Sequence, residues 1–214
     1  MDYAYGNWFL VIIISGLFIW FCYDAFKPKN KVDWQSFGAF SAFIIALFAE
    51  MYGFPLTIYL LSSYFGNKFP QLNFSHNSGH LFEVVLGNSG DPHVSFLHIL
   101  SYGLIIAGLV LITKSWGILY QAVKLDKIAT TGPYEYIRHP QYVGFLIIIV
   151  GFLFQWPTLP TLIMAPILFI MYLRLAKKEE QKTLQTHPEY VVYKKLTPAF
   201  IPSIKKLIQG NIKL

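Results

Sequence analysis

The chain is a succession of long apolar runs separated by shorter polar stretches, and the lengths of the runs predict helices that cross a membrane. A helix needs about 20 mostly apolar residues to span the roughly 30 Å hydrocarbon core of a bilayer. Runs of this kind occupy residues 7–25, 37–65, 94–113, 140–156 and 158–176. We therefore expect an all-α fold, a polytopic membrane protein with five transmembrane helices.

The second run is too long for one straight span. A helix over residues 37–65 would be about 43 Å long, so we expect it to tilt or to break at Gly53 and Pro55. A tight corner at residues 155–157 predicts that the last two spans form an antiparallel helical hairpin. Residues 114–137 are mixed and amphipathic, and a polar, basic tail follows the last span.

Composition supports a membrane protein. The chain is 55% hydrophobic and only 13% charged, about half the charge of a soluble domain. We expect one domain over residues 1–214, with N-terminal spans in 1–113 and a functional core in 114–204. The first run has no basic segment before it and no cleavage site after it, so we expect an anchor rather than a cleaved signal peptide. This favours a prokaryotic inner membrane.

The basic residues predict the orientation. With five spans and an outer N-terminus, Lys68 is the one residue of 17 Lys and Arg that falls outside. Positive charge collects on the cytosolic side of membrane proteins, so we expect a cytosolic C-terminus. The net charge of +6 then reports topology. No basic run interleaved with aromatics points to nucleic acid.

The most polar stretch beside a span is residues 131–144. Gly132 and Pro133 indicate a turn, and Pro140 can open a helix because the first helical position needs no N–H. Arg138 and His139 are thereby held at the mouth of an apolar helix. An anion site is expected there, with backbone N–H groups from residues 141–143. The alternative is an interfacial anchor, with Arg reaching the headgroups.

The predicted hairpin brings a second polar group to this place. The last span runs into Glu179 and Glu180, which can then face Arg138 and His139. An anion site beside paired carboxylates suits a zwitterionic ligand with an added cation, such as an amino acid bearing a sulfonium. A set of interfacial salt bridges is the alternative. We also expect the tail from Glu179 to Pro202 to pack back over the site.

Several motifs in order resemble the C-terminal half of the isoprenylcysteine carboxyl methyltransferase family and of the related phospholipid N-methyltransferases. They are Gly132-Pro133-Tyr134, Arg138-His139-Pro140-Gln141-Tyr142-Val143-Gly144, Glu179-Glu180, Glu189-Tyr190 with Tyr193, and Pro202. The resemblance covers roughly residues 114–204 and implies S-adenosylmethionine in a cytosolic pocket without a Rossmann fold. No G-x-G-x-x-G follows a strand here.

The resemblance also implies site residues. The cofactor pocket would use Lys127, Ile128, Ala129, Tyr134, His139, Pro140, Gln141, Tyr142 and a glutamate of the pair Glu179 and Glu180. An arginine about one turn before the family's glutamate contacts the substrate, and Arg174 is the nearest candidate. The chain departs from the pattern at His187-Pro188, where many members have Phe-Gly. This leaves open which glutamate matches.

Two further features lie in the N-terminal half. Glu50 is a carboxylate in an apolar run, a candidate for function by default. It could meet a substrate amine or be protonated and hydrogen-bonded within the bundle. The second feature is a group on the predicted outer side with partial metal spacing. Because its first residues are poor helix formers, we expect no metal site. The group is His76, His80, Glu83, His93 and His98.

These observations predict a membrane methyltransferase that moves a methyl group from S-adenosylmethionine to a lipophilic or amphipathic acceptor. Arg138, Arg174 and Glu50 are its candidate catalytic residues. The reacting atom, a carboxylate, an amine or a thiol, and the oligomeric state stay open. The alternative is a small transporter or lipid-binding protein with a midplane site at Glu50 and the break at residues 53–55.

Overall fold

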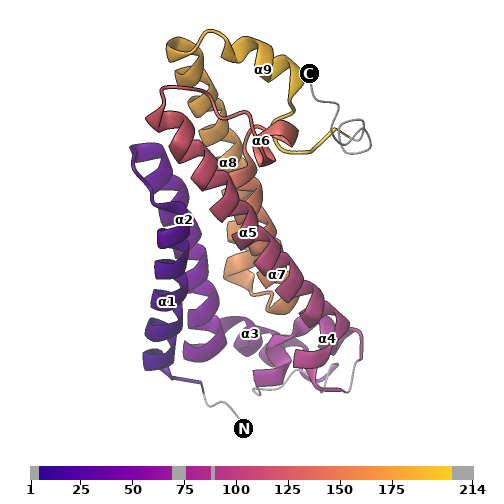
Figure 1. Ribbon diagram of the computed structural model, residues 1–214. Coiled ribbons are helices and arrows are strands. Elements are labelled where there is room, and N and C mark those ends of the chain that lie inside the picture. Colours follow the sequence, from indigo (N-terminus) through magenta and orange to yellow (C-terminus); the bar gives the residue numbers. More distant parts are fainter. Residues whose placement is uncertain (1–4, 69–75, 88–89, 204–214) are drawn as a thin grey trace.

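The computed structural model describes residues 5–68, 76–87 and 90–203, and this part of the chain is helical, without strands. Figure 1 shows a bundle of long helices with short helices at both ends. The elements in order are α1 (Trp8–Phe26), α2 (Lys31–Phe48), a π-helical turn (Ala49–Gly53), α3 (Leu56–Phe65), a 3₁₀ turn (His76–Gly79), α4 (Leu81–Val85), a second 3₁₀ turn (Pro92–Val94), α5 (Phe96–Lys124), α6 (Pro133–Tyr136), α7 (Pro140–Gln155), α8 (Leu159–Thr186) and α9 (Tyr190–Leu196).

Four helices of the described chain are long and apolar enough to cross a membrane. They are Trp8–Phe26, Lys31–Gly53, Phe96–Lys124 and Leu159–Thr186. The remaining predicted span, residues 140–156, corresponds to α7, which has 16 residues and is therefore about 24 Å long. The all-helical membrane class is confirmed. The count of five, which depends on α7, and the cytosolic side of the C-terminus stay predictions.

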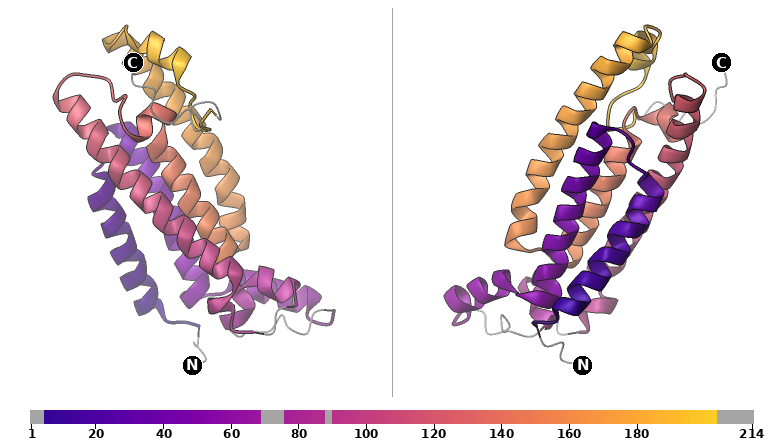
Figure 2. Two further views of the ribbon diagram at one scale, coloured as in Figure 1. Left: turned by 45° about the vertical axis from the view of Figure 1, so that its right-hand side comes forward. Right: turned by 90° about the vertical axis from the view of Figure 1, so that its left-hand side faces the viewer.

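The predicted second span over residues 37–65 is broken in two, as its length led us to expect. The helix already begins at Lys31, passes into the π turn at Ala49 and ends at Gly53. After Pro55 the chain starts again as α3, which lies across the end of the bundle in both views of Figure 2. The break falls where Gly53 and Pro55 predicted it, because proline has no N–H to continue the helix and clashes with the preceding turn.

Two helices continue past their predicted ends. α5 extends to Lys124 rather than stopping near residue 113, and α8 extends to Thr186 rather than residue 176. The segment 114–137 is thus a continuation of α5 followed by a loop and α6. Both extensions project at the same end of the bundle, where α6 and α9 also lie (Figure 1). They build the walls of the site described below.

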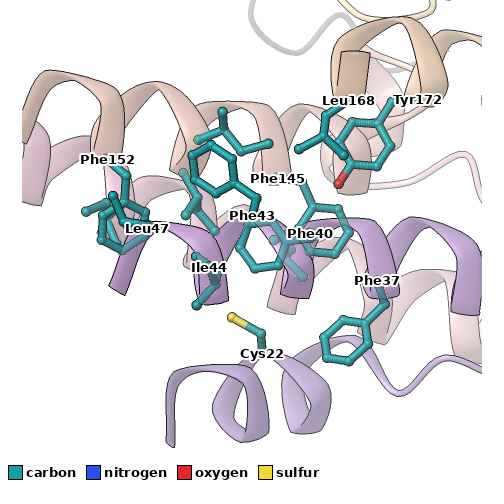
Figure 3. Packing of buried hydrophobic residues seen from close by; sticks show 14 of the residues in the cluster. Cys22, Phe37, Phe40, Phe43, Ile44, Leu47, Phe145, Phe152, Leu168 and Tyr172 are labelled. Atoms are coloured by element: carbon teal, nitrogen blue, oxygen red, sulfur yellow. The ribbon is translucent and has the colours of Figure 1, made fainter. Parts of the chain in front are cut away.

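The core is rich in phenylalanine. Phe40 and Phe43 of α2 and Phe145 of α7 are fully buried, and Figure 3 shows them between α2 and the α7–α8 hairpin. The rings of Phe40 and Phe145 lie 4.7 Å apart, centroid to centroid. This packing joins the N-terminal helices to the predicted functional core, so the chain has one continuous interior.

The closest helix pair is α5 and α7, which meet through glycines. A Cβ atom at Gly108 would lie 2.6 Å from Cγ1 of Ile148 and 2.7 Å from the carbonyl oxygen of Gly144. A Cβ atom at Gly144 would lie 2.5 Å from Cγ1 of Ile112. The absence of side chains lets the two backbones touch. This contact fixes the position of α7, and with it the polar segment that precedes α7.

Candidate functional site

The predicted polar cluster forms at the start of α7. Nε of Arg138 donates to Oε1 of Glu180 at 2.8 Å, and another guanidinium nitrogen lies 2.7 Å from the same oxygen. Nε2 of His139 lies 2.9 Å from that oxygen as well. Nζ of Lys194 lies 2.8 Å from the second oxygen of Glu180. Glu180 is therefore surrounded by three basic groups, two from the segment that precedes α7 and one from α9.

Glu179 occupies a different position in the cluster. Its carboxylate accepts a hydrogen bond from the hydroxyl of Tyr142 at 2.5 Å and lies 3.6 Å from Nδ1 of His139. Its side chain is 26% exposed, against 7% for Glu180. The two neighbouring glutamates thus divide into one that is enclosed by cations and one that still reaches solvent.

The C-terminal tail closes over this cluster. The backbone N–H groups of Arg138 and His139 donate to the carbonyl oxygens of Pro198 and Ala199 at 2.9 and 3.1 Å. A guanidinium nitrogen of Arg138 also donates to the carbonyl oxygen of Lys194 at 3.1 Å and to that of Thr197. The tail packs back as the sequence predicted, and it contributes a cation to the site.

The surroundings of His139 shift its pKa toward the protonated ring. Burial disfavours the charged ring, but the nearby carboxylates of Glu179 and Glu180 outweigh this cost and raise the pKa of His139. The buried Tyr134 behaves as a neutral donor, because burial, with Glu179 nearby, raises its pKa well above the ordinary range. Its hydroxyl donates to Oε1 of Gln141 at 3.1 Å.

The predicted backbone anion site is smaller than expected. The N–H of Val143 donates to the carbonyl oxygen of His139 at 3.2 Å, so it serves the helix rather than a ligand. Pro140 has no N–H. The first-turn groups that can serve an anion are therefore those of Gln141 and Tyr142, beside the His139 ring.

An apolar groove lies against the same segment. It has a volume of about 950 Å³ and lies between α5, the residues around α6, α7 and the tail. Ile137, Val143 and Phe200 line it, and Lys114 and Gln121 are among its few polar members. Phe200 also stacks on the ring of His139, with the centroids 5.6 Å apart. The polar cluster and the groove therefore share one aromatic wall.

The structure brings most of the predicted site residues together, but not all. Arg174 is exposed on α8. Lys127, Ile128 and Ala129 lie on the loop between α5 and α6, where the N–H of Lys127 donates to the carbonyl oxygen of Ala122 at 2.9 Å. Glu50 is buried in the π turn that ends α2, near the opposite end of the bundle (Figure 1).

Sequence reasoning did not single out Lys194. It named Phe200 only as one of the apolar residues that would hold the tail over the site, and no motif gave it a place beside His139. The available signal was the spacing of Lys194 on α9. It lies four residues after Tyr190, one helical turn, and therefore on the face that packs toward the bundle.

Comparison with known proteins agrees with the motifs. Residues 96–189 match the family model of phospholipid methyltransferases, which confirms the resemblance for that part of the chain. The matched segment includes Arg138, His139, Glu179 and Glu180 and ends directly before α9. The family indicates a membrane methyltransferase.

Two curated relatives share half of the chain. The cobalt-zinc-cadmium resistance protein CzcN of Cupriavidus metallidurans is 31% identical over 108 residues, 50% of this chain and 50% of that protein. The nickel-cobalt-cadmium resistance protein NccN of Alcaligenes xylosoxydans xylosoxydans is 29% identical over 108 residues, 50% of this chain and 51% of its own. The chain thus spans about half the length of these relatives in the match. No solved structure matches it significantly.

Proposed function

We propose that this chain, whose residues 96–189 match the phospholipid methyltransferase model, transfers a methyl group from S-adenosylmethionine to a lipophilic acceptor. The observation that carries the proposal is the shared wall at Phe200. One side of the ring contacts the charged cluster through His139, and the same residue lines the apolar groove. A polar methyl donor and an apolar acceptor need two such compartments in contact.

The residues of the cluster fit the amino-acid part of the cofactor. His139 is 3% exposed, and its Nδ1 is buried without a hydrogen-bond partner. Together with the first-turn N–H groups of α7 it offers donors to a carboxylate. Glu179 offers an acceptor to an ammonium group. A carboxylate held by charged donors contributes about 1.5–3 kcal/mol per contact.

The two glutamates take separate roles in this proposal. Glu180 already accepts from Arg138, His139 and Lys194, so we assign it to positioning those groups. Glu179, which is partly exposed and held by Tyr142, is the one that meets the cofactor. We therefore choose Glu179 as the cofactor-binding glutamate, a choice that the sequence left open.

The chemistry requires alignment more than a strong acid or base. When bound, S-adenosylmethionine would supply a sulfonium methyl group that the acceptor atom attacks in line with the C–S bond, which breaks to release the neutral thioether. The chain orients the acceptor by enclosing its apolar part in the groove, and the tail at residues 198–200 excludes water from the cluster. Lys114 lines the groove and can neutralise an acidic group on the acceptor.

The alternative, a transporter with a site at Glu50, fits the contacts less well. Oε2 of Glu50 accepts from the N–H of Thr57 at 3.0 Å, and Oε1 accepts from the Thr57 hydroxyl at 3.0 Å. That hydroxyl in turn accepts from the N–H of Leu159 at 2.8 Å. Glu50 thus joins the starts of α3 and α8, a structural task that needs no ligand.

Calorimetry with S-adenosylmethionine on detergent-solubilised protein tests the proposal. We expect Glu179→Gln to weaken binding about ten- to a hundredfold with little change in melting temperature, and Glu189→Gln, at an exposed position outside the cluster, to bind like wild type. If wild type does not bind S-adenosylmethionine, or if Glu179→Gln and His139→Ala both bind it as wild type does, the cofactor site is not here.

A second candidate function comes from the names of the relatives. Both are named for resistance to divalent metals, so methyl transfer by this chain could serve such resistance. Growth of a metal-sensitive host on graded cobalt or cadmium tests this. Wild type should raise the tolerated concentration and His139→Ala should not; equal growth with both variants would remove methyl transfer as the cause.

A further inference from the structure

The start of α2 lies close to the polar cluster, although it comes from the other half of the sequence. Figure 2 shows α2 beside α8, and the hydroxyl of Tyr172 on α8 donates to the carbonyl oxygen of Ser36 on α2 at 3.3 Å. The two helices run in opposite directions, so residues before Ser36 lie at the same end as residues after Tyr172, which include Glu179. Asp33 lies one turn before Ser36, and both are buried on the face of α2 that packs against α8.

The carboxylate of Asp33 is buried without a cation. Asp33 is 6% exposed, and its Oδ2 accepts from the backbone N–H groups of Lys29 and Asn30 at 3.0 and 3.2 Å, which completes the capping box of α2. Within the described part of the chain, Oδ1 makes no hydrogen bond, and no basic side chain forms an ion pair with Asp33. The positive end of the helix favours a charge here, but burial without a cation disfavours it. A positively charged ligand would offset that cost.

The charge of Asp33 acts on the hydroxyl groups of the site. Burial raises the pKa of Tyr134, and the charges of Glu179 and, more weakly, of Asp33 add to this effect. Asp33 also interacts electrostatically with the hydroxyl of Tyr142, which donates to Glu179. The ring of Tyr142 stacks on that of Tyr172, with the centroids 5.3 Å apart. Two negative charges, one from α2 and one from α8, therefore lie near the same tyrosine.

The polar cluster itself carries more positive than negative charge. With His139 protonated, it holds three cations, the other two being Arg138 and Lys194. Glu179 and Glu180 supply two negative charges. S-adenosylmethionine has one carboxylate against an ammonium and a sulfonium, so it also carries an excess positive charge. Because like charges repel, a further negative charge near the site would favour binding of this cofactor.

We propose that Asp33 supplies the counter-charge for the sulfonium of S-adenosylmethionine, and that the chain thereby distinguishes the methyl donor from its demethylated product. This rests on the function proposed above, which places the cofactor carboxylate beside His139 and the ammonium group beside Glu179 but leaves the sulfonium without a partner. After methyl transfer the sulfur is a neutral thioether, so the attraction to Asp33 is lost. The product is then bound more weakly than the methyl donor that replaces it.

Calorimetry with two ligands on the detergent-solubilised full chain tests this role. S-adenosylmethionine and S-adenosylhomocysteine share the amino-acid and nucleoside parts and differ in the sulfonium charge. In a protein interior, a full charge about 10 Å away still changes the affinity for a cation by about tenfold, so wild type should bind S-adenosylmethionine about tenfold more tightly than the product. Asp33→Asn keeps an oxygen for the cap of α2. It should weaken binding of the methyl donor about tenfold and that of the product by about twofold or less.

Three control variants separate the charge of Asp33 from its structural role. Asp33→Glu keeps the charge and should keep the preference for the methyl donor. Asp24→Asn makes the same change on a side chain that is 69% exposed, and it should bind both ligands like wild type. Glu179→Gln should weaken binding of both ligands to a similar degree, because both carry the ammonium group that Glu179 is proposed to meet.

The outcomes distinguish this proposal from the one on which it rests. If wild type binds neither ligand, the cofactor site is not here and both proposals fail. If wild type binds the product as tightly as the methyl donor, the role of Asp33 is overturned while the cofactor site stands. The same conclusion follows if Asp33→Asn weakens both ligands by one factor, or weakens neither. The comparison in wild type needs no variant, so it decides the matter even if Asp33→Asn does not fold.

Discussion

Glu180 and Glu50 are both buried carboxylates on apolar helices, at opposite ends of the bundle, and their exposures are almost the same, 6% and 5%. Their partners differ. Glu180 is bound by Arg138, His139 and Lys194, which come from the segment before α7 and from α9. Glu50 is bound by the N–H and hydroxyl of one residue, Thr57.

The difference in partners distinguishes the proposed binding site at Glu180 from the structural hydrogen bonds at Glu50. Neutral donors that lie seven residues away hold Glu50 in a local hydrogen-bonded turn that ends one helix and starts the next. Basic groups more than ten residues away in sequence hold Glu180, namely Arg138 and His139 before α7 and Lys194 on α9. A cluster of basic groups beside a groove is suited to an anionic ligand. Burial alone would not have distinguished the two carboxylates; the origin and charge of their partners does.

The largest effect should come from removing the charge of Glu180. Glu180→Gln leaves three basic groups together without their counter-ion, and breaking a buried ion pair by one partner costs about 3–5 kcal/mol. Thermal unfolding in detergent measures this. Glu189→Gln, at a position 61% exposed, is the matched control and should change stability by about 0.5 kcal/mol or less. A Glu180→Gln variant as stable as the control would show that the cluster does not support the fold.

A smaller loss of stability is expected from changes where α5 packs closely against α7. Gly108→Ala inserts a methyl group 2.7 Å from a backbone oxygen and should cost about 1–3 kcal/mol by overpacking. Gly103→Ala changes the same helix where nothing lies within 4 Å of the added atom, and it should be neutral or slightly stabilising. Equal melting temperatures for the two variants would mean that α5 and α7 can move apart to admit the methyl group without loss of stability.

The long helices and the site differ in how far the sequence predicts them. Apolar runs predict membrane spans directly, since a helix that crosses a bilayer must be apolar over its length. Pro55 likewise predicted the break after α2. The ends of α5 and α8 were placed too early, because the hydropathy pattern stops at the membrane boundary while the helices do not. Their polar extensions are stabilised by contacts such as the Glu180 cluster, which no local pattern encodes.

Within the site, the order of motifs predicted which residues meet but not how they pair. His139 and both glutamates come together as expected. Whether the Val143 N–H bonds within the helix depends on the exact placement of the backbone. Whether Lys194 reaches Glu180 depends on the path of the tail. Likewise, the spacing of His80, His93 and His98 suggested little, because their contact arises from loops rather than from one helix face.

Glu50→Gln tests the structural role of Glu50 and should lower the stability of the protein only modestly. The amide of glutamine has one oxygen, which can accept from the Thr57 N–H or from its hydroxyl, whereas the carboxylate accepts from both. We therefore expect the free energy of unfolding to fall by roughly 0.5–1.5 kcal/mol and the binding of S-adenosylmethionine to stay unchanged. Thr57→Val should destabilise the protein similarly, since it removes the hydroxyl that donates to Glu50 and accepts from Leu159, while the backbone N–H bond to Glu50 stays. Loss of acceptor turnover in Glu50→Gln at unchanged stability would return Glu50 to the catalytic residues.

The smallest effect is the pH dependence that His139 adds to stability. Its pKa is raised in the folded protein by Glu179 and Glu180, which outweigh burial and the nearby positive charges of Arg138 and Lys194. The stabilisation is therefore fully present below the unfolded pKa of about 6.5 and is lost as pH rises through the folded pKa. Melting temperatures of wild type and His139→Gln, measured between pH 6 and pH 9 and compared as a difference, should converge toward the alkaline end. A difference that stays constant across this range would mean that folding does not raise the pKa of His139, and the cluster would then lack the extra positive charge on which the proposed affinity for an anion depends.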